Sequence, residues 1–218
     1  MAPVVIFGVG STADLAHYYL THDSTHSVTA FTCEQRHISQ STKFGLPVVP
    51  YEDLQSAFPP TSVHLFAPCT GNNLNKFRER VYLEGKRRGY RFISYISSHA
   101  TVLTNMIGEN CFILEDNTIQ PFAKIGNNCV LWSGNHIGHH STIEDHVFIT
   151  SHVVVAGNCL VKKYSWLGIN AAISDRVTVA QGTVVGMCAG VTKDTTGNAV
   201  YVGVPAKKLR DCDDSIIL

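Results

Sequence analysis

An aliphatic side chain stands at every sixth position of this chain from residue 107 to residue 191. All fifteen positions of the series hold Ile, Leu or Val, namely Ile107, Ile113, Ile119, Ile125, Leu131, Ile137, Ile143, Ile149, Val155, Val161, Leu167, Ile173, Val179, Val185 and Val191. A period of six differs from the alternation of an ordinary β-strand and from the 3.6-residue period of an α-helix. It is the period of hexapeptide β-helix repeats, in which each repeat forms one flat face of a coil. The pattern therefore predicts a parallel β-helix with three faces and eighteen residues in each coil.

Two other positions of the hexad carry residues that suit a narrow three-sided prism. Four places after each aliphatic residue the side chain is mostly small, as at Cys111, Ala123 and Ser141. Three places after it Asn, Asp or Gly recurs, at Asn110, Asp116, Asn128, Gly134, Asn158, Asn170, Gly182 and Asp194. Those residue types tolerate the sharp, partly positive-φ corners that such a prism requires. We expect about five coils, roughly 24 Å tall at the usual spacing of paired strands, with the left-handed coiling that is usual for hexapeptide solenoids.

The first hundred residues follow a different pattern, in which short apolar runs alternate with helical stretches. The pattern predicts strands at residues 4–7, 28–32, 63–67 and 92–96, and helices at residues 13–20 and 75–88. Strand, glycine turn and helix in this order indicate a small Rossmann-like α/β unit. We therefore expect a Rossmann-like nucleotide-binding domain at residues 1–98, a left-handed parallel β-helix at residues 99–196 and a closing segment at residues 197–218.

The turn after the first predicted strand contains Gly8 and Gly10, which would let backbone N–H groups approach a phosphate at a helix N-terminus. Ala13 replaces the third glycine of the dinucleotide fingerprint, so a tight turn without a ligand is the alternative. Fewer than a hundred residues make about half of a doubly wound dinucleotide fold, which suits one nucleotide rather than NAD. Glu34 ends the second predicted strand, where it could accept a hydrogen bond from ribose or base, or could equally be an exposed surface acid.

Composition narrows the range of partners and compartments. The chain has 17 Lys plus Arg and 17 Asp plus Glu, so no overall field favours nucleic acid or an anionic membrane. The basic run at residues 86–88 reads as the solvated end of a helix. The chain opens directly into a predicted strand, and no apolar stretch is long enough to cross a bilayer, so we expect neither a leader sequence nor a membrane-spanning segment. Three of the seven cysteines, Cys111, Cys129 and Cys159, occupy small interior positions of the repeat, so we expect reduced thiols and a cytoplasmic protein.

Five of the eleven histidines lie between residues 136 and 152. A metal site is the first hypothesis for such a cluster, but the spacing argues against it. His140, His146 and His152 are six residues apart, so they should point from three successive faces and cannot converge, and we expect no metal. A single exposed histidine acting as a general base fits better, because imidazole can accept a proton near neutral pH. For most of these histidines a solvated corner position is the simpler interpretation.

The hexads and the closing sequence at residues 202–207, Val-Gly-Val-Pro-Ala-Lys, resemble the hexapeptide-repeat acyltransferases. More narrowly, nearly the whole chain is similar to bacterial nucleotide-sugar acyltransferases related to the bacillosamine N-acetyltransferases and the sialic acid O-acetyltransferases. That family pairs a small nucleotide-binding domain with a left-handed β-helix, and its catalytic histidine lies in a corner that here reads Gly-His-His-Ser-Thr-Ile, residues 138–143. The resemblance therefore implies His139 as the general base.

The resemblance also implies the groups around the base. One coil after His139, a glycine amide of the family holds the thioester carbonyl, which implies Gly157 as an oxyanion donor. The relatives often carry an acid after the base, where this chain has His140. Some relatives carry another histidine near the acyl group, at a position that is Phe148 here.

The ligands follow from the same resemblance. Acetyl-CoA is implied as co-substrate, with residues Ile169, Ala172 and Met187 along its pantetheine and Lys207 and Arg210 near its phosphates. The nucleotide of a sugar substrate would contact Gly8, Gly10, Ser11, Glu34, Asn72 and Asn73. A homotrimer is implied, with three sites between neighbouring β-helices.

The favoured function is transfer of acetyl from acetyl-CoA to the amine of a nucleotide-linked sugar by direct attack. The favoured acceptor is a 4-amino-4,6-dideoxy sugar on UDP, dTDP or GDP, destined for surface polysaccharide such as lipopolysaccharide, or for glycoprotein. O-acetylation of a sugar hydroxyl is one alternative. A non-catalytic β-helix scaffold or nucleotide-sugar binding module is an alternative of another class.

Overall fold

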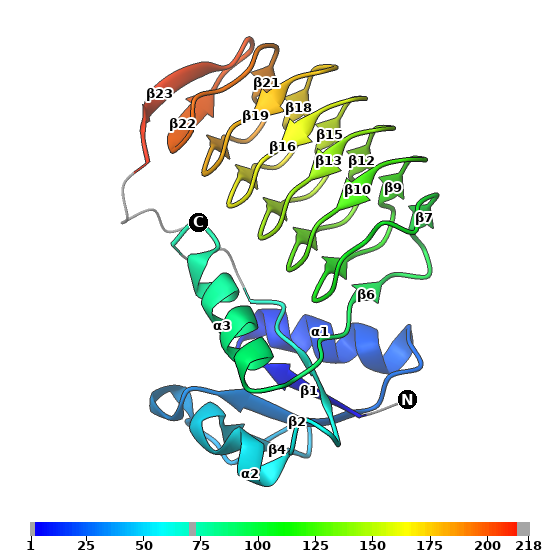
Figure 1. Ribbon diagram of the computed structural model, residues 1–218, viewed down its shortest axis with the longest axis vertical. Coiled ribbons are helices and arrows are strands. Elements are labelled where there is room, and N and C mark those ends of the chain that lie inside the picture. The colour runs from blue at the N-terminus through cyan, green and yellow to red at the C-terminus, as the bar shows by residue number, and fades with distance from the viewer. Residues whose placement is uncertain (1–2, 70–72, 213–218) are drawn as a thin grey trace.

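The hexads fold into a prism of three parallel sheets above a smaller α/β region (Figure 1). The computed structural model describes residues 3–69 and 73–212. The eight-stranded face holds β6 (Tyr95–Ile96), β8 (Phe112–Ile113), β11 (Val130–Leu131), β14 (Phe148–Ile149), β17 (Trp166–Leu167), β20 (Val184–Val185), β22 (Ala199–Val202) and the antiparallel β23 (Lys207–Asp211). The six-stranded face holds β7 (Thr101–Val102), β9 (Thr118–Ile119), β12 (His136–Ile137), β15 (Val154–Val155), β18 (Ala172–Ile173) and β21 (Gly190–Val191). The four-stranded face holds β10 (Lys124–Ile125), β13 (Thr142–Ile143), β16 (Leu160–Val161) and β19 (Thr178–Val179).

The register between coils is the eighteen residues that the hexads predict. Leu131 pairs with Ile149, which pairs with Leu167 in the next coil. The aliphatic series points inward and forms one continuous core with the small residues, among them Cys111 and Cys159. The predicted fold class, an α/β region followed by a parallel β-helix, is therefore confirmed.

The corners repeat a left-handed backbone conformation at every sixth residue from 110 to 188. Seven of the eight predicted corner residues adopt positive φ, namely Asn110, Asp116, Asn128, Gly134, Asn158, Asn170 and Gly182. Asp194 does not, because the last coil is shorter and Val184 pairs with Val200 rather than with residue 202. The Asp194 carboxylate instead accepts a hydrogen bond from the Thr178 backbone N–H (2.7 Å). Less permissive residues, including His140 and His152, hold the same conformation elsewhere in the series.

The N-terminal region is a five-stranded sheet between helices. Its strand order is β3 (Thr42–Lys43), β4 (Leu46–Pro50), β2 (Val28–Cys33), β1 (Val4–Phe7) and β5 (His64–Phe66), parallel except for β3. The helices are α1 (Ser11–His22), α2 (Leu54–Ala57) and α3 (Lys76–Arg87), with 3-10 turns at Gln35–His37 and Tyr51–Asp53. The predicted helices and the first three predicted strands are present, whereas β3 and β4 were not predicted.

The single strand predicted at residues 92–96 is wrong, because two sheets divide that segment. Phe92 bridges to Leu65 in the N-terminal sheet, whereas β6 pairs with β8 in the β-helix. The same apolar run therefore carries the chain from one sheet into the other.

The N-terminal region packs on the eight-stranded face of the β-helix. Phe112, Val130 and Phe148 point outward from that face and are buried with residues of α1 and β1. The side chain of Arg78, on α3, is fully buried, and its guanidinium donates to the carbonyls of Asn128 (3.1 Å) and His146 (3.2 Å). Val154 and Ala172 on the six-stranded face, Lys124 on the four-stranded face and His139 at the corner between them are exposed.

All seven cysteines are free thiols. No helix within residues 3–69 and 73–212 is long and apolar enough to cross a membrane.

Candidate functional site

The corner between the six-stranded and four-stranded faces brings His139 and Gly157 together. A Cβ placed on Gly157 would lie 2.8 Å from both Cε1 and Nε2 of His139, so the imidazole covers the glycine. The carbonyl of His139 accepts a hydrogen bond from the Asn158 backbone N–H (2.9 Å), which holds the two coils in this register. Within the described residues the Gly157 N–H has no hydrogen-bond acceptor. A proton acceptor and an unpaired backbone donor therefore lie side by side at an exposed corner.

Side chains of the coil below and of the same corner hold the His139 residue in place. The Gln120 Oε1 accepts a hydrogen bond from the His139 backbone N–H (2.9 Å). His139 Nδ1 lies 3.1 Å from His140 Nδ1, with the two rings at 84°. The other side of the His140 ring lies against Phe122, with 4.7 Å between centroids. The contacts of Gln120 and Phe122 with the histidine pair were not predicted, although both residues lie about one coil before it.

An acid also lies at this corner, one coil above Gly157. Asp175 Oδ1 lies 3.2 Å from the position that a Cβ on Gly157 would take. The side-chain Nδ2 of Asn158 donates a hydrogen bond to the same oxygen (3.4 Å). Asp175 Oδ2 forms an ion pair with Arg176 (2.9 Å). Asp175 was not predicted as a neighbour of this corner, although the coil period places it eighteen residues after Gly157.

The other clustered histidines lie apart, as their spacing predicts. His140, His146 and His152 occupy three different corners, and each has positive φ. His146 is buried at the corner beside α3, where its Nδ1 contacts the Asn128 amide (2.8 Å) and its Nε2 lies 3.4 Å from Glu79. Burial lowers the pKa of His146 and outweighs the opposite effect of Glu79. Among the described residues no group of three or more His, Cys, Asp or Glu side chains could hold a metal ion.

A cavity of about 350 Å³ lies over the turn between β1 and α1 in the N-terminal region. Gly8, Gly10, Ser11 and Glu34, all predicted nucleotide contacts, line it. Gly8 has φ +118°, which favours glycine for the fold alone, whereas a Cβ on Gly10 would meet no atom within 4 Å. The fold therefore gives no steric reason for glycine at position 10. Its absent side chain leaves the backbone at the N-terminus of α1 accessible to an anion.

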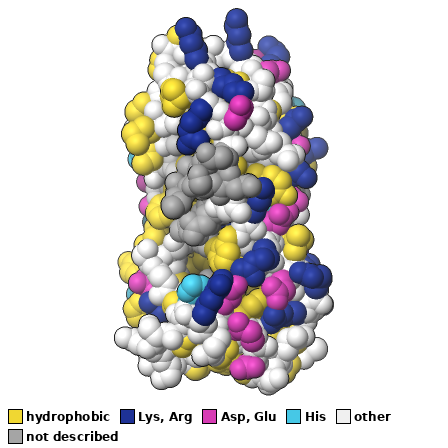
Figure 2. Space-filling view, turned by 90° about the vertical axis from the view of Figure 1, so that its left-hand side faces the viewer, with side chains coloured by type: hydrophobic (Ala, Val, Ile, Leu, Met, Phe, Trp, Pro, Cys, Tyr) yellow, Lys and Arg dark blue, Asp and Glu magenta, His cyan; other side chains and the backbone are white. Residues whose placement is uncertain are grey.

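Two arginines bind Glu34, which lines this cavity. Its carboxylate contacts Arg36 (2.6 Å) and Arg80 (2.7 Å). Burial acts to raise the pKa of Glu34, but the hydrogen bonds from Arg80 and Arg36 outweigh it and hold the pKa below its ordinary value. Figure 2 shows basic and acidic side chains next to one another over the lower half of the molecule. Glu34 is thus an ionised, already engaged carboxylate, and a ligand would share it with two guanidinium groups.

The remaining predicted nucleotide contacts lie on the loop before α3. Asn73 is exposed and has φ +51°, whereas Asn72 lies outside the described residues. Burial raises the pKa of the nearby Cys69 thiol, which lines the cavity, to about 12. That thiol is therefore protonated at neutral pH and unsuited to nucleophilic attack.

The predicted CoA contacts lie along other edges of the β-helix. Ile169 and Met187 are stacked one coil apart at the corner between the eight-stranded and six-stranded faces, and both are largely exposed. Ala172 is exposed on β18, and Lys207 and Arg210 lie on the terminal strand β23. Within one chain, the six-stranded face therefore separates Ile169 and Met187 from the His139 corner. Phe148 lies elsewhere, buried under α3 and stacked on Trp166 at 4.1 Å.

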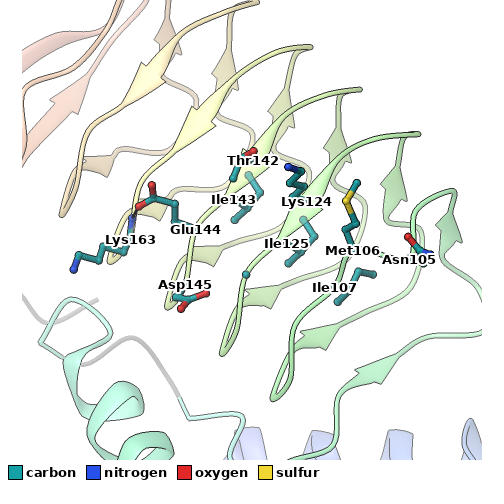
Figure 3. Close-up of a pocket in the computed structure, with 11 residues that line it drawn as sticks. Asn105, Met106, Ile107, Lys124, Ile125, Thr142, Ile143, Glu144, Asp145 and Lys163 are labelled. Carbon is teal, nitrogen blue, oxygen red and sulfur yellow. Dashed lines mark hydrogen bonds between the residues drawn. The ribbon is translucent and has the colours of Figure 1, made fainter.

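A groove of about 540 Å³ runs over the four-stranded face and was not predicted (Figure 3). Its lining residues come from successive coils, including Lys124, Thr142, Glu144 and Lys163. Thr142 follows the His139 corner directly along the chain, so the groove shares its face with that corner.

Known proteins match this chain both in its repeat and in its fold. The family model described as bacterial transferase hexapeptide (six repeats) matches residues 106–138 and 122–157. Both matched stretches fall on the hexad series. The predicted resemblance to hexapeptide-repeat acyltransferases is therefore confirmed at the level of the repeat.

Solved structures extend the likeness to the whole chain. A histidine-to-asparagine variant of perosamine N-acetyltransferase from Caulobacter crescentus, in complex with CoA and GDP-perosamine, has a TM-score of 0.85 and 22% identity over 97% of this chain and 98% of that chain. The acetyltransferase domain of PglB from Neisseria gonorrhoeae FA1090, in complex with acetyl coenzyme A, has a TM-score of 0.82 and 19% identity over 95% of this chain and 99% of that domain. These TM-scores establish a shared fold.

Curated relatives match over shorter stretches. Galactoside O-acetyltransferase from Escherichia coli (strain K12) is 27% identical over 107 residues, 48% of this chain and 50% of that protein. The chain spans half or less of the length of the curated relatives it matches.

Proposed function

We propose that this chain is an acetyl-CoA-dependent N-acetyltransferase that acts on a nucleotide-linked amino sugar. The observation that carries the proposal is the contact between the His139 imidazole and Gly157 at an exposed corner. A base beside a free backbone donor is what attack of an amine on a thioester requires. The solved relatives with CoA and GDP-perosamine, or with acetyl coenzyme A, support this class of reaction.

The reaction proceeds by direct transfer. The substrate nitrogen attacks the thioester carbon while His139 Nε2 accepts its proton, and the Gly157 N–H stabilises the developing oxyanion. The new N–C bond replaces the C–S bond, and the proton held by His139 passes to the departing CoA sulfur. No cysteine nucleophile is required, because alignment and deprotonation suffice for an amine.

Two copies of the chain complete each site in this proposal. In a three-sided prism the corner that carries His139 lies opposite the eight-stranded face, on which the N-terminal region packs. A sugar held on the Gly8–Gly10 cavity of one chain would therefore reach the His139 corner of a neighbour. The stacked Ile169 and Met187 also lie on a different corner from His139. A homotrimer with CoA between neighbouring β-helices brings these edges together.

The favoured acceptor is a 4-amino-4,6-dideoxy sugar on UDP, dTDP or GDP, for surface polysaccharide or glycoprotein. We place the reaction in the cytoplasm, where seven free cysteines suit the reducing conditions. The test measures thiol release from acetyl-CoA with a panel of nucleotide-linked amino sugars and the corresponding 4-hydroxy sugars. Release with the amino sugars alone supports N-acetylation. Release only with the hydroxy sugars means an O-acetyltransferase, and no release with either set means a scaffold or binding module.

Replacing the base tests the mechanism. We expect His139→Ala to lower kcat roughly 10²- to 10⁴-fold with unchanged secondary structure and nucleotide binding, because the side chain is exposed and its main role is proton transfer. His152→Asn removes an exposed histidine from the same coil and serves as the matched control. A kcat near that of the wild type in His139→Ala would remove His139 from the mechanism.

A further inference from the structure

His140 faces the side of His139 that does not face Gly157. The two Nδ1 atoms are 3.1 Å apart, within hydrogen-bond distance, and the rings are nearly perpendicular. The backbone of His140 has φ +59°, and Phe122 lies against its ring from the coil below. Within residues 3–69 and 73–212, the hydrogen-bond partner of His140 Nδ1 is His139 Nδ1.

Either histidine can be the donor in this hydrogen bond, and the direction decides whether His139 Nε2 can accept a proton. When His139 donates its Nδ1–H, its Nε2 carries a lone pair and can accept a proton. When His140 donates instead, neutral His139 carries its hydrogen on Nε2 and cannot act as a base there. A protonated His140 carries hydrogen on both nitrogens, so it can only donate and imposes the unproductive tautomer.

We propose that His140 is a positioning residue that sets the tautomer of His139, so that the base functions only while His140 is neutral. The inference rests on the proposed function, because it assigns a role within that reaction. His140 thus makes the reaction depend on the protonation of two imidazoles, which an acceptor that does not titrate would avoid.

The residues around the histidine pair provide no other partner for the ring nitrogens in the described part of the chain. Gln120 and Phe122 below, and Gly157 and Asn158 above, are uncharged. The charged residues along this corner include Asp175 and Arg176, which pair with each other two coils above His139, and Lys124, exposed on β10 after Phe122. None of these three contacts a ring nitrogen of either histidine in the described part of the chain.

Substitutions that suit a left-handed corner separate the role in tautomer selection from a role in folding. Glycine and asparagine both tolerate φ near +59°, so His140→Gly removes the acceptor and His140→Asn keeps one in the form of Oδ1. His152→Gly and His152→Asn are the matched controls, since His152 is exposed at φ +58° on the same coil. We expect His140→Gly to lower kcat at least about tenfold with little change in KM for acetyl-CoA, His140→Asn to retain most of the wild-type kcat, and both His152 variants to match the wild type.

The pH profile gives a readout that a structural role would not change. In this proposal a proton on either imidazole of the wild-type pair stops the reaction, so the acid limb of log kcat/KM should lie at higher pH in the wild type than in His140→Asn. Titration of the substrate amine is common to both proteins and cancels in the comparison. A wild-type kcat in His140→Gly, or an identical acid limb in His140→Asn, overturns the proposal.

A measurement without substrate separates this inference from the proposed function. Long-range ¹H–¹⁵N spectra of the histidine-labelled protein report which ring nitrogen carries the hydrogen, and His139→Ala assigns the signal. We expect His139 to carry hydrogen on Nδ1 in the wild type and in His140→Asn, and to move toward Nε2–H in His140→Gly. The same tautomer in all three proteins refutes the pairing. The expected tautomers without acetylation of any sugar sustain the pairing and refute the function.

Discussion

At the scale of single residues, the site depends on the space that Gly157 leaves for an imidazole. A Cβ at this position would lie 2.8 Å from two ring atoms of His139, closer than non-bonded carbon atoms approach. Gly157 has no positive φ that would require glycine for the backbone. The His139 ring, rather than the backbone conformation, therefore requires glycine at this position.

This contact predicts the effect of one methyl group. Gly157→Ala should displace the His139 ring and lower kcat about 10- to 100-fold, since a misplacement near 1 Å costs rates of that order, while the free energy of unfolding changes little. Steady-state kinetics and urea unfolding measure the two effects. In the His139→Ala background the same substitution should have almost no further effect on kcat. An equal loss in both backgrounds would show that the methyl group acts elsewhere, for instance on the thioester.

At the scale of elements, the contact between α3 and the β-helix includes a histidine held neutral by burial. His146 lies at a left-handed corner, stacks on Tyr164 and contacts Asn128 and Glu79. Because burial lowers its folded-state pKa below the ordinary 6.5, the unfolded chain binds a proton there more readily. The stability that follows is present above pH 6.5 and is lost as the pH falls through the folded-state pKa.

His146→Asn tests this linkage with a residue that suits the corner and keeps an acceptor for Asn128. We expect the free energy of unfolding of the wild type to fall more steeply between pH 7.5 and pH 5 than that of the variant. Urea unfolding across that range measures both slopes, with His152→Asn as the exposed control. Parallel curves for wild type and His146→Asn would mean that His146 binds protons equally in the folded and unfolded states.

At the scale of the whole molecule, the α/β region and His139 lie on opposite sides of the prism. If a neighbour completes each site, two defective chains should complement each other. Gly10→Asp places a carboxylate against the proposed phosphate position, where the fold leaves open space for it, and His139→Ala removes the base.

Each variant alone should be inactive, whereas trimers refolded from an equal mixture should regain roughly a quarter of wild-type activity, as random assembly of shared sites requires. Light scattering confirms the assembly before the assay. Mixtures as inactive as their components would place the nucleotide and the base of each site on one chain.

The residues of the site differ in how far the sequence alone predicts them. A spacing of eighteen is enough to place Gly157 over His139 once the coil length is known. The contacts of Gln120 and Asp175 follow from the same arithmetic but were not predicted, because side-chain direction at a corner is not visible in a period. The pairing of His140 with His139 also depends on a backbone turn that the residue type does not favour.

The sequence by itself determined the repeat, the coil length, the inward series and most of the positive-φ corners. These features are local and periodic, so each hexad specifies them again. Only the tertiary structure decided which face the α/β region covers, why residues 92–96 divide between two sheets, and where Glu34 finds its two arginines. Those outcomes depend on contacts between segments far apart in the chain, and such contacts leave no periodic pattern in a single sequence. The resulting arrangement leaves the His139 corner open to a partner.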